Sequence, residues 1–277
     1  MTDALKTAKL KAERTYNSAA DTFDAEPLGF WDRYGRQTVE RMQLRRGARV
    51  LDLCCGTGAS ALPAAHAVGP EGTVIAIDLA EELLKLGRTK AAAGGLSNVE
   101  FRRGDMTALD FPDGYFDAVV CVFGIFFVPN MEAQVAELWR LVRPGGQLAI
   151  TTWGPDIFAP AYEVWLAAVQ RARPDLYSAY NPWDRITTPA AVRKLFADAG
   201  VPHVEIVDEE GHQPLRGPED FWAIALGSGL RWTIDQMGIE AARSVRQEIL
   251  ATLTAQGVDY VGTNVIYAVA QKRTGSV

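Results

Sequence analysis

The chain has few cysteines and no segment that resembles an export signal. Its three cysteines are odd in number, and two of them, Cys54 and Cys55, are adjacent. This is not the pattern of a disulfide framework. The first 21 residues, MTDALKTAKLKAERTYNSAAD, lack the continuous apolar stretch of a signal peptide. We therefore expect a protein of a reducing compartment, the cytoplasm.

Long apolar runs and blocks of positive charge are also missing. The longest apolar run, residues 118–128, is too short to span a membrane and is typical of a buried strand with its following turn. The formal net charge is −6, and there is no tail rich in lysine and arginine. A surface that follows a phosphate backbone is not expected, which disfavours nucleic-acid substrates.

What is present is an alternation of strand and helix patterns. The 277 residues, 48% of them apolar, suit one α/β domain with a sizeable insertion, or two small domains. Each predicted strand is a continuous apolar run, which is typical of burial on both faces in a parallel sheet covered by helices. The pattern predicts helices at 4–14, within 27–45, from 59, at 81–93 and at 131–141, and strands at 49–53, 73–77, 99–103, 118–122 and 147–152, the last after a turn at 143–146.

Beyond residue 153 this alternation stops. A helix is predicted at 162–171, then a loop rich in proline and aromatic residues, then a helix at 189–199. Two further strands are predicted at 204–208 and 265–270, with mostly helical residues at 212–257 between them. Such a long connection still allows this last pair to lie antiparallel at one edge of the sheet.

A glycine-rich turn follows the first strand of the alternation, in residues 50–58, VLDLCCGTG. Gly56 and Gly58 let a ligand approach the backbone closely, and the helix that follows presents free N–H groups. Asp78, twenty residues further on, ends the second strand, where a carboxylate can accept hydrogen bonds from both hydroxyls of a ribose. Taken alone this pair is ambiguous. Residues 56–61 also satisfy the dinucleotide pattern G-x-G-x-x-A of dehydrogenases, and another α/β protein could use such a turn.

Three downstream segments distinguish these alternatives. Gly104-Asp105-Met106 follows the third strand, and the segments 109–117 (LDFPDGYFD) and 138–146 (LWRLVRPGG) lead into the fourth and fifth strands. In this order and at these spacings, the series resembles class I S-adenosylmethionine-dependent methyltransferases, most closely the group that contains the ubiquinone and menaquinone C-methyltransferases. The resemblance covers residues 47–153, with a weaker echo in residues 16–24. It implies a Rossmann-like, seven-stranded, mostly parallel sheet with helices on both faces and a helical cap.

The resemblance also implies a set of cofactor contacts. The turn at residues 54–58 would cradle the methionine part, and the carbonyl of Cys121 would meet the amino-acid part. Asp78 would bind the ribose, while Leu79, Asp105 and the Met106 N–H would contact the adenine. Tyr16 would close over the cofactor, whose product is S-adenosylhomocysteine. The residues so implied are Tyr16, Cys54, Gly56, Thr57, Gly58, Asp78, Leu79, Asp105, Met106 and Cys121.

The chain departs from the family pattern in two places. Cys54 replaces the usual first glycine of the turn, and Phe126 and Phe127 stand where relatives often carry a histidine. The second change removes an obvious general base, so the catalytic residue stays unknown and His212 is a weak candidate. The cysteines are interpreted as small buried hydrophobes rather than as thiolates for arsenic or another metal. Asp52 and Asp117 are interpreted as structural residues, and His66 and His203 as residues at the surface or the core edge.

Aromatic residues gather outside the predicted core. The resemblance divides the chain into an N-terminal helical cap (1–46), a cofactor-binding core (47–153), a cap insertion (154–188) and the rest of the core (189–277) with a helical insertion (212–257). Rings in and beside the cap suit an apolar or planar substrate, although they can equally hold the cap on the core. The predicted substrate pocket comprises Trp31, Tyr34, Phe127, Trp153, Trp183, Trp222 and Trp232, and the neighbouring rings of the cap are Phe30, Phe158, Trp165, Tyr177, Tyr180 and Phe221.

The predicted activity is transfer of a methyl group to an oxygen, carbon or nitrogen atom of a small, largely apolar molecule. In-line displacement from a sulfonium chiefly requires alignment, so proximity is the expected source of catalysis. Gly35 and residues 227–229 are points at which a lid over the pocket could move. The expected assembly is a monomer or homodimer without nucleic acid or metal. The alternatives are a methyltransferase that acts on macromolecules and a protein that binds the cofactor without catalysis.

Overall fold

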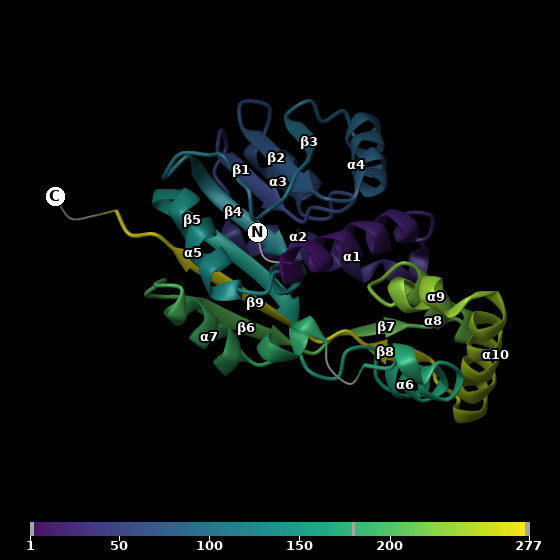
Figure 1. The fold of residues 1–277 in the computed structure, drawn as a ribbon. Helices are drawn as coiled ribbons and strands as arrows, with labels where there is room; N and C mark the ends of the chain where they lie inside the picture. Colours follow the sequence, from purple (N-terminus) through teal and green to yellow (C-terminus); the bar gives the residue numbers. More distant parts are fainter. Residues whose placement is uncertain (1–2, 179–180, 275–277) are drawn as a thin grey trace.

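The computed structural model describes residues 3–178 and 181–274. Its centre is a seven-stranded sheet with the strand order β3-β2-β1-β4-β5-β9-β6 (Figure 1). All its strands are parallel except β9, which runs antiparallel to both of its neighbours. The predicted mostly parallel sheet is therefore confirmed, with the last two strands at one edge. The strands are β1 (Arg49–Leu53), β2 (Thr73–Asp78), β3 (Val99–Arg103), β4 (Phe116–Val122), β5 (Val142–Trp153), β6 (Glu205–Glu209) and β9 (Val265–Gln271).

Helices cover both faces of this sheet (Figure 1). The helix α2 packs on β4, β5 and β9, while α5 packs on β4 and β5 and against α7. The apolar strands between them form the core, where β1 and β4 are buried almost along their whole length. The helices of this part are α2 (Phe30–Met42), α3 (Ala61–Val68), α4 (Glu81–Ala93), α5 (Met131–Leu141) and α7 (Pro189–Asp198).

The remaining helices form a layer at one end of the sheet (Figure 1). There α10 packs on α6 and α8, and α1 reaches from α4 to α9. Within the described part of the chain, no helix is both long and apolar enough to cross a bilayer. The helices are α1 (Asp3–Ala19), α6 (Ala161–Ala172), α8 (Pro218–Leu226), α9 (Arg231–Met237) and α10 (Ile239–Gln256), with the short 3-10 helices η1 (Glu26–Leu28), η2 (Ile125–Phe127), η3 (Pro174–Leu176) and η4 (Pro182–Ile186).

Residues 212–257 are mostly helical, as predicted, because they hold α8, α9 and α10, but they begin with the short strand β7 (His212–Pro214). This strand pairs with β8 (Tyr260–Gly262) in a separate two-stranded sheet. A three-residue strand has no periodicity of its own, so only the long-range pairing creates it. The predicted turn at 143–146 is instead the first part of β5, beside an irregularity in its pairing with β4.

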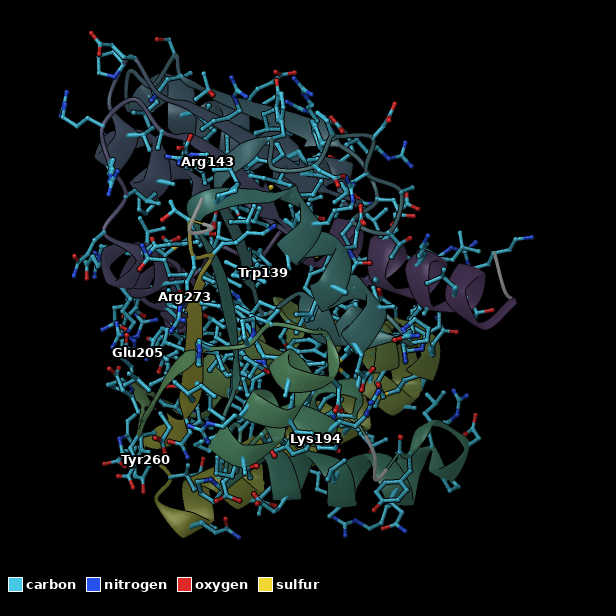
Figure 2. The ribbon with its side chains drawn as sticks, turned by 90° about the vertical axis from the view of Figure 1, so that its left-hand side faces the viewer. Trp139, Arg143, Lys194, Glu205, Tyr260 and Arg273 are labelled. Carbon is cyan, nitrogen blue, oxygen red and sulfur yellow. The ribbon has the colours of Figure 1, made fainter. Side chains whose placement is uncertain are left out.

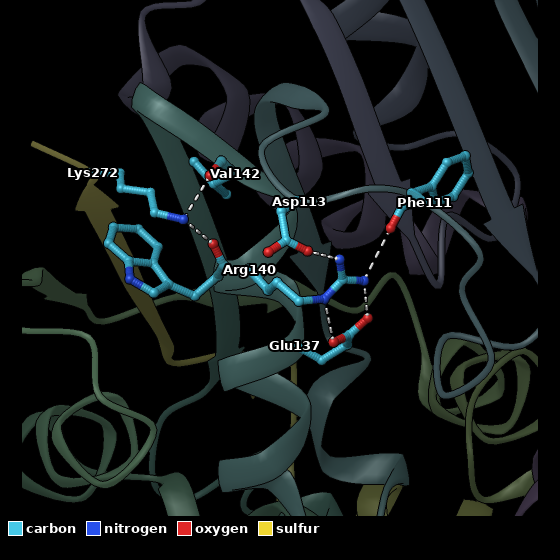
Figure 3. Close-up of polar contacts among 7 residues, drawn as sticks. Phe111, Asp113, Glu137, Arg140, Val142 and Lys272 are labelled. Atoms are coloured by element: carbon cyan, nitrogen blue, oxygen red, sulfur yellow. Dashed lines mark hydrogen bonds and ion pairs between the residues drawn. The ribbon is translucent and has the colours of Figure 1, made fainter. Parts of the chain in front are cut away.

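The two charged motifs that precede β4 and β5 are bound to each other (Figure 3). Arg140 forms ion pairs with Asp113 and Glu137 and donates to the carbonyl of Phe111. The Lys272 ammonium donates to the carbonyls of Trp139 and Val142, at 2.8 Å each. These contacts fix the start of β5 against the end of β9. The charges of both motifs therefore have a structural role at the end of the sheet where β5 begins.

An open groove lies on the molecular surface at this same end of the sheet. It is lined by Arg143, Glu205, Lys272 and Arg273, among others, and Figure 2 shows three of these labelled along one side of the molecule. The aromatic side chain of Trp153 stands at the other end of β5, where a second and more enclosed cavity lies. The groove and the cavity thus lie at opposite ends of the strands of the sheet.

Candidate cofactor and substrate site

The enclosed cavity lies at the carboxyl ends of the parallel strands, where open α/β sheets bind ligands. Its floor comes from the turn after β1, the end of β2 and the segments that follow β3, β4 and β5. Side chains of α1 and the loop between α8 and α9 cover it. One end, here called the cofactor end, is formed by Cys54, Gly56, Asp78, Leu79, Asp105 and Met106, and the other, the aromatic end, by Trp31, Phe123, Phe126, Phe127, Trp153, Phe158, Tyr162 and Trp183.

The turn after β1 adopts left-handed backbone conformations. The φ angle is +56° at Cys54, +53° at Gly56 and +96° at Gly58. A Cβ at Gly58 would lie 2.9 Å from Leu62 Cγ, so that glycine is required by packing beneath the turn. A Cβ at Gly56 would make only ordinary contacts, the nearest with the Phe23 ring at 3.6 Å, and Gly56 lines the cavity. It is therefore at Gly56 that the turn leaves its backbone open to a ligand.

Asp78 has the environment of a ligand-binding carboxylate. Its Oδ2 accepts from the Gly56 N–H at 2.9 Å, and its Oδ1 accepts from the Ala80 N–H at 2.8 Å. Burial raises the pKa of this carboxyl, and within the described residues no cation pairs with it. The two oxygens together offer about four lone pairs, and the backbone N–H groups of Gly56, Ala80 and Leu79 do not occupy all of them. These two acceptors fit the two hydroxyls of a ribose.

Asp105 is held by neighbours on both oxygens. Oδ1 accepts from the N–H and the hydroxyl of Thr107, at 2.8 and 2.9 Å, and Oδ2 forms an ion pair with Lys9 of α1. Partial burial opposes ionisation, but the hydrogen bonds from Lys9 and Thr107 hold the pKa of Asp105 below its usual value. Lys9 therefore ties α1 across the cofactor end. A polar helix gives no sequence signal for this role.

Tyr16, also from α1, covers the same end. Its ring lies edge-on to Phe23 and Phe127, with centroids 6.2 and 5.6 Å apart. Burial and the charge of Asp78 raise the pKa of the Tyr16 phenol, so it is neutral at physiological pH. It is suited to cover a bound ligand and not to act as a base.

The sulfur atoms form a small group behind the turn. The Cys54 thiol lies 3.5 Å from Met106 Sδ and is hydrogen bonded to the Cys121 thiol. That hydrogen bond and burial raise the pKa of Cys54 well above its usual value, so the thiol stays protonated. Among residues 3–178 and 181–274 no group of three His, Cys, Asp or Glu side chains could hold a metal ion. This arrangement agrees with cysteines that serve in packing.

Asp52 lies beneath the turn and is completely buried. Its Oδ2 accepts from the Ser60 hydroxyl at 2.8 Å, whereas Oδ1 has no partner in the described structure. Burial raises the pKa of Asp52 to about 8, so the carboxyl is largely protonated at neutral pH. The Ser60 side of this pair reaches the cavity wall.

The aromatic end is a set of rings from four segments of the chain. Phe123 and Trp153 are stacked with centroids 3.9 Å apart, and Trp31 lies 5.5 Å from each of them. The ring of Trp183 in η4 meets Phe126 edge-on at 5.7 Å. Phe123, which the sequence interpretation did not include, directly follows β4 and is central to this end. Its position after a buried strand was the available signal.

The structure brings together 11 of the predicted site residues at this cavity, and it places seven others elsewhere. Thr57 is buried and donates to Asp24, Gly58 serves packing, and Cys121 is completely buried. The Tyr34 hydroxyl donates to the Thr263 carbonyl at 2.7 Å, and Trp222 packs on Trp165. Lys11 lies over Trp232, and His212 is exposed beside Tyr260. Tyr180 lies outside the described residues. Those that line the cavity are Tyr16, Trp31, Cys54, Gly56, Asp78, Leu79, Asp105, Met106, Phe127, Trp153 and Trp183.

Comparisons with known proteins point to one enzyme family. Residues 8–174 match the model of the ubiE/COQ5 methyltransferase family. The demethylmenaquinone methyltransferase of Listeria welshimeri is 32% identical over 191 residues, which cover 65% of this chain and 80% of the relative. That of Geobacillus kaustophilus is 39% identical over 127 residues, which cover 46% of this chain and 54% of the relative.

Solved structures show the same fold. The YcgJ protein of Bacillus subtilis has a TM-score of 0.56 at 20% identity, over 88% of this chain and 100% of that chain. A phosphoethanolamine N-methyltransferase of Haemonchus contortus, solved with S-adenosylhomocysteine, has a TM-score of 0.58 at 15% identity. The aligned part is 96% of this chain and 60% of the Haemonchus enzyme. With the family match over more than half of its length, the chain belongs to the ubiE/COQ5 methyltransferase family and is an S-adenosylmethionine-dependent methyltransferase.

Proposed function

We propose that the cavity binds S-adenosylmethionine at its cofactor end and a planar, largely apolar ring compound of quinone type at its aromatic end. The observation that carries this proposal is the division of one cavity into two chemically different halves. Asp78 and Asp105 supply acceptors at one end, and stacked rings form the other. The relatives named demethylmenaquinone methyltransferase support a quinone-type acceptor for this chain too.

At the cofactor end, each side chain is proposed to bind one part of the cofactor. Asp78 accepts from the ribose hydroxyls, Leu79 packs on the adenine, and the Gly56 backbone lies along the methionine part. Asp105 retains one lone pair on Oδ2 for the adenine amino group beside the Lys9 contact. When bound, the cofactor supplies a methyl group on a positively charged sulfur. Tyr16 and Phe23 exclude water from above.

At the aromatic end, the chain mainly has to orient the acceptor. Tyr162 is the ionisable side chain that the described residues place there, and burial raises the pKa of its phenol. A neutral phenol is a poor base, so the rate is proposed to come from alignment of the acceptor atom with the methyl carbon. This favours an electron-rich ring, whose carbon or oxygen atom is already nucleophilic.

The protein is further proposed to work in the cytoplasm, as a monomer or homodimer, and without a nucleic-acid substrate. The net charge of −6 and the small, enclosed cavity support an acceptor of low molecular mass. Size-exclusion chromatography with light scattering measures the assembly. A higher oligomer would contradict the proposed states.

The test of the proposed function is an assay of methyl transfer with labelled S-adenosylmethionine. The acceptors are reduced naphthoquinones and benzoquinones with short tails, a catechol, phosphoethanolamine and a short RNA. We expect labelled product from the reduced quinones, identified by mass spectrometry, and little from phosphoethanolamine or RNA. Transfer to phosphoethanolamine or RNA alone would overturn the proposal.

A further inference from the structure

Two tryptophans of the aromatic end carry hydrogen-bond donors without an acceptor. The indole nitrogens Nε1 of Trp31 and Trp183 are both buried, and neither has a partner among the described residues. A buried donor left without a partner loses the hydrogen bond that water gives it in the unfolded chain, which destabilises the folded state. Such groups usually mark a place where a ligand or an ordered water completes the hydrogen bonding.

The location of these donors relates them to the cavity. Of the five described residues with an unpartnered buried side-chain atom, Trp31 and Trp183 line the cavity, whereas Arg33, Asp52 and Thr152 do not. The nitrogen of the third tryptophan of the cavity, Trp153, is not among these buried atoms. The two side chains therefore form part of the wall around the space that the acceptor is proposed to occupy.

Both indoles are held in place by other rings. Trp31 lies parallel to Phe23, with an interplanar angle of 2° and centroids 5.5 Å apart, and it touches Phe30 edge-on. Trp183 is held by Phe126 and by its position in η4, whose first turn is fixed by a capping box between Asn181 and Asp184. A donor that packing already orients loses little entropy when it binds, so it selects a geometry as well as a ligand.

The charges around the cavity limit what these donors can bind. The acidic and lysine side chains in its described lining are Asp78, Asp105 and Lys9, all at the cofactor end, and the last two are paired with each other. The aromatic end therefore has no carboxylate for an ammonium group and no cation for a phosphate. The Tyr162 hydroxyl at this end is already hydrogen bonded to the Asn181 amide. What remains is a pair of neutral donors in an apolar wall.

We infer that Trp31 and Trp183 are specificity-determining residues that donate their indole N–H groups to oxygen atoms on the ring of the methyl acceptor. This inference rests on the proposed function and adds the groups that orient the ring. Two donors at separate points on the wall fix the rotation of a planar ring within its own plane. Stacking against apolar side chains alone leaves that rotation free. That rotation decides which ring atom faces the methyl group.

The experiment removes each N–H and keeps an aromatic ring. Trp31→Phe and Trp183→Phe are compared with Trp153→Phe, which shrinks a ring of the same cavity whose nitrogen is not among the buried atoms without a partner. Each protein is assayed with a reduced quinone that carries two ring oxygens and with matched analogues that lack one of them. Affinity for S-adenosylhomocysteine and the melting temperature are measured for every variant, so that loss of folding or of cofactor binding is recognised.

We expect Trp31→Phe and Trp183→Phe each to lower kcat/KM about 3- to 10-fold for the two-oxygen acceptor, as loss of one neutral hydrogen bond predicts. Each should have little effect on the analogue that lacks its oxygen, and mass spectrometry should detect a second methylated isomer. Equal losses on all acceptors, or the same pattern in Trp153→Phe, would overturn the inference while leaving the proposed function in place. If the wild-type enzyme neither binds nor methylates any ring compound, the proposed function fails, and the inference fails with it.

Discussion

Two buried carboxyl groups near the turn illustrate how position sets the use of one residue type. Asp52 and Asp78 both have a raised pKa because of burial. Asp78 receives two backbone N–H groups and reaches the cavity, which suits an ionised acceptor. Asp52 receives only the Ser60 hydroxyl and lies inside the core, which suits a protonated acid. The first is therefore suited to binding, and the second to supporting the turn.

Replacement of Asp52 by Asn should change the pH dependence of stability. The pKa of Asp52 is about 8 in the folded protein, and about 3.9 is usual in an unfolded chain. Between these values the folded state keeps a proton that the unfolded state releases, so stability falls as pH rises. One such group contributes a slope of up to about 1.4 kcal/mol per pH unit. Asp52→Asn should flatten the urea-derived free energy of unfolding between about pH 4 and 8.

Asp52→Asn also has an internal control. Asp78 has a folded pKa shifted in the same direction, so it adds to the slope in both proteins, and the difference between the two slopes reports mainly on Asp52. Ser60→Ala deletes the hydroxyl and keeps the acid, so it should preserve the slope while lowering stability at every pH. An unchanged slope in Asp52→Asn would show that the carboxyl is ionised in the folded state.

Replacement of Asp78 by Asn should weaken cofactor binding. The amide keeps the size of the side chain but offers one acceptor oxygen instead of two, and its charge is lost. Loss of a charge-assisted hydrogen bond costs about 1.5–3 kcal/mol, which corresponds to a 10- to 150-fold rise in Kd. Isothermal titration calorimetry with S-adenosylhomocysteine measures this. Asp110→Asn, outside the cavity lining, is the control, and equal affinities of both variants would refute the assignment.

At the scale of elements, α2 shows how a helix positions the cavity. It carries Trp31 at its start, and Gly35 lies where the helix crosses the turn after β1. A Cβ at Gly35 would come within 2.4 Å of the Ala59 carbonyl group. The sequence interpretation took Gly35 as a possible point of lid movement. The structure instead gives it a close helix-to-backbone contact, so this part of the site is fixed.

Gly35→Ala should therefore destabilise the protein and displace α2. Overpacking of this kind costs about 1–3 kcal/mol, which a small gain in helix propensity offsets only partly. Gly217→Ala is a matched control, because the same methyl group would meet no atom within 4 Å there and the backbone is extended. Chemical denaturation compares both variants. A Gly35→Ala protein as stable as Gly217→Ala would mean that α2 can shift at no cost.

At the scale of the whole molecule, α1 connects the two parts that surround the cavity. It packs against α4 on the sheet side and against α9 on the side of the helical layer. Lys9 and Tyr16 point from it into the cofactor end, and Gly229 of the opposite loop comes near the Tyr16 hydroxyl. The helix is thus placed to cover a bound cofactor while it contacts both the sheet side and the helical layer. Entry of the cofactor should require α1 to move.

Cofactor binding should consequently stabilise the whole protein and protect α1. At a free concentration one hundred times Kd, a ligand that binds only the folded state adds about 2.7 kcal/mol to the free energy of unfolding. Trypsin sites at Lys6, Lys9, Lys11 and Arg14 report on α1 directly. We expect S-adenosylhomocysteine to raise Tm and to slow cleavage at these sites. NAD is the control ligand, and cleavage at an unchanged rate in saturated protein would contradict a covering role for α1.

The sequence alone determined the sheet and the cofactor end. Apolar runs place β1, β2, β4 and most of β5, because a strand buried on both faces must be largely apolar, and α4 and α5 begin and end at the predicted residues. The edge strand β3 is mostly exposed and has only Phe101 buried. Gly56, Asp78 and Asp105 follow the ends of successive strands, so a parallel sheet brings them to one edge whatever the details of packing. This inference needs only local pattern and topology.

Only the tertiary structure decided which aromatic residues face the cavity and which serve packing. Trp31 and Trp183 line it, whereas Trp222 and Trp232 pack elsewhere, although all four have similar surroundings in the sequence. Lys9 likewise reaches Asp105 across 96 positions, and no local pattern announces that contact. Hydrophobicity favours burial of a ring, but it does not determine which residues the ring packs against. The partner it finds is set by the packing of segments that are distant in the chain.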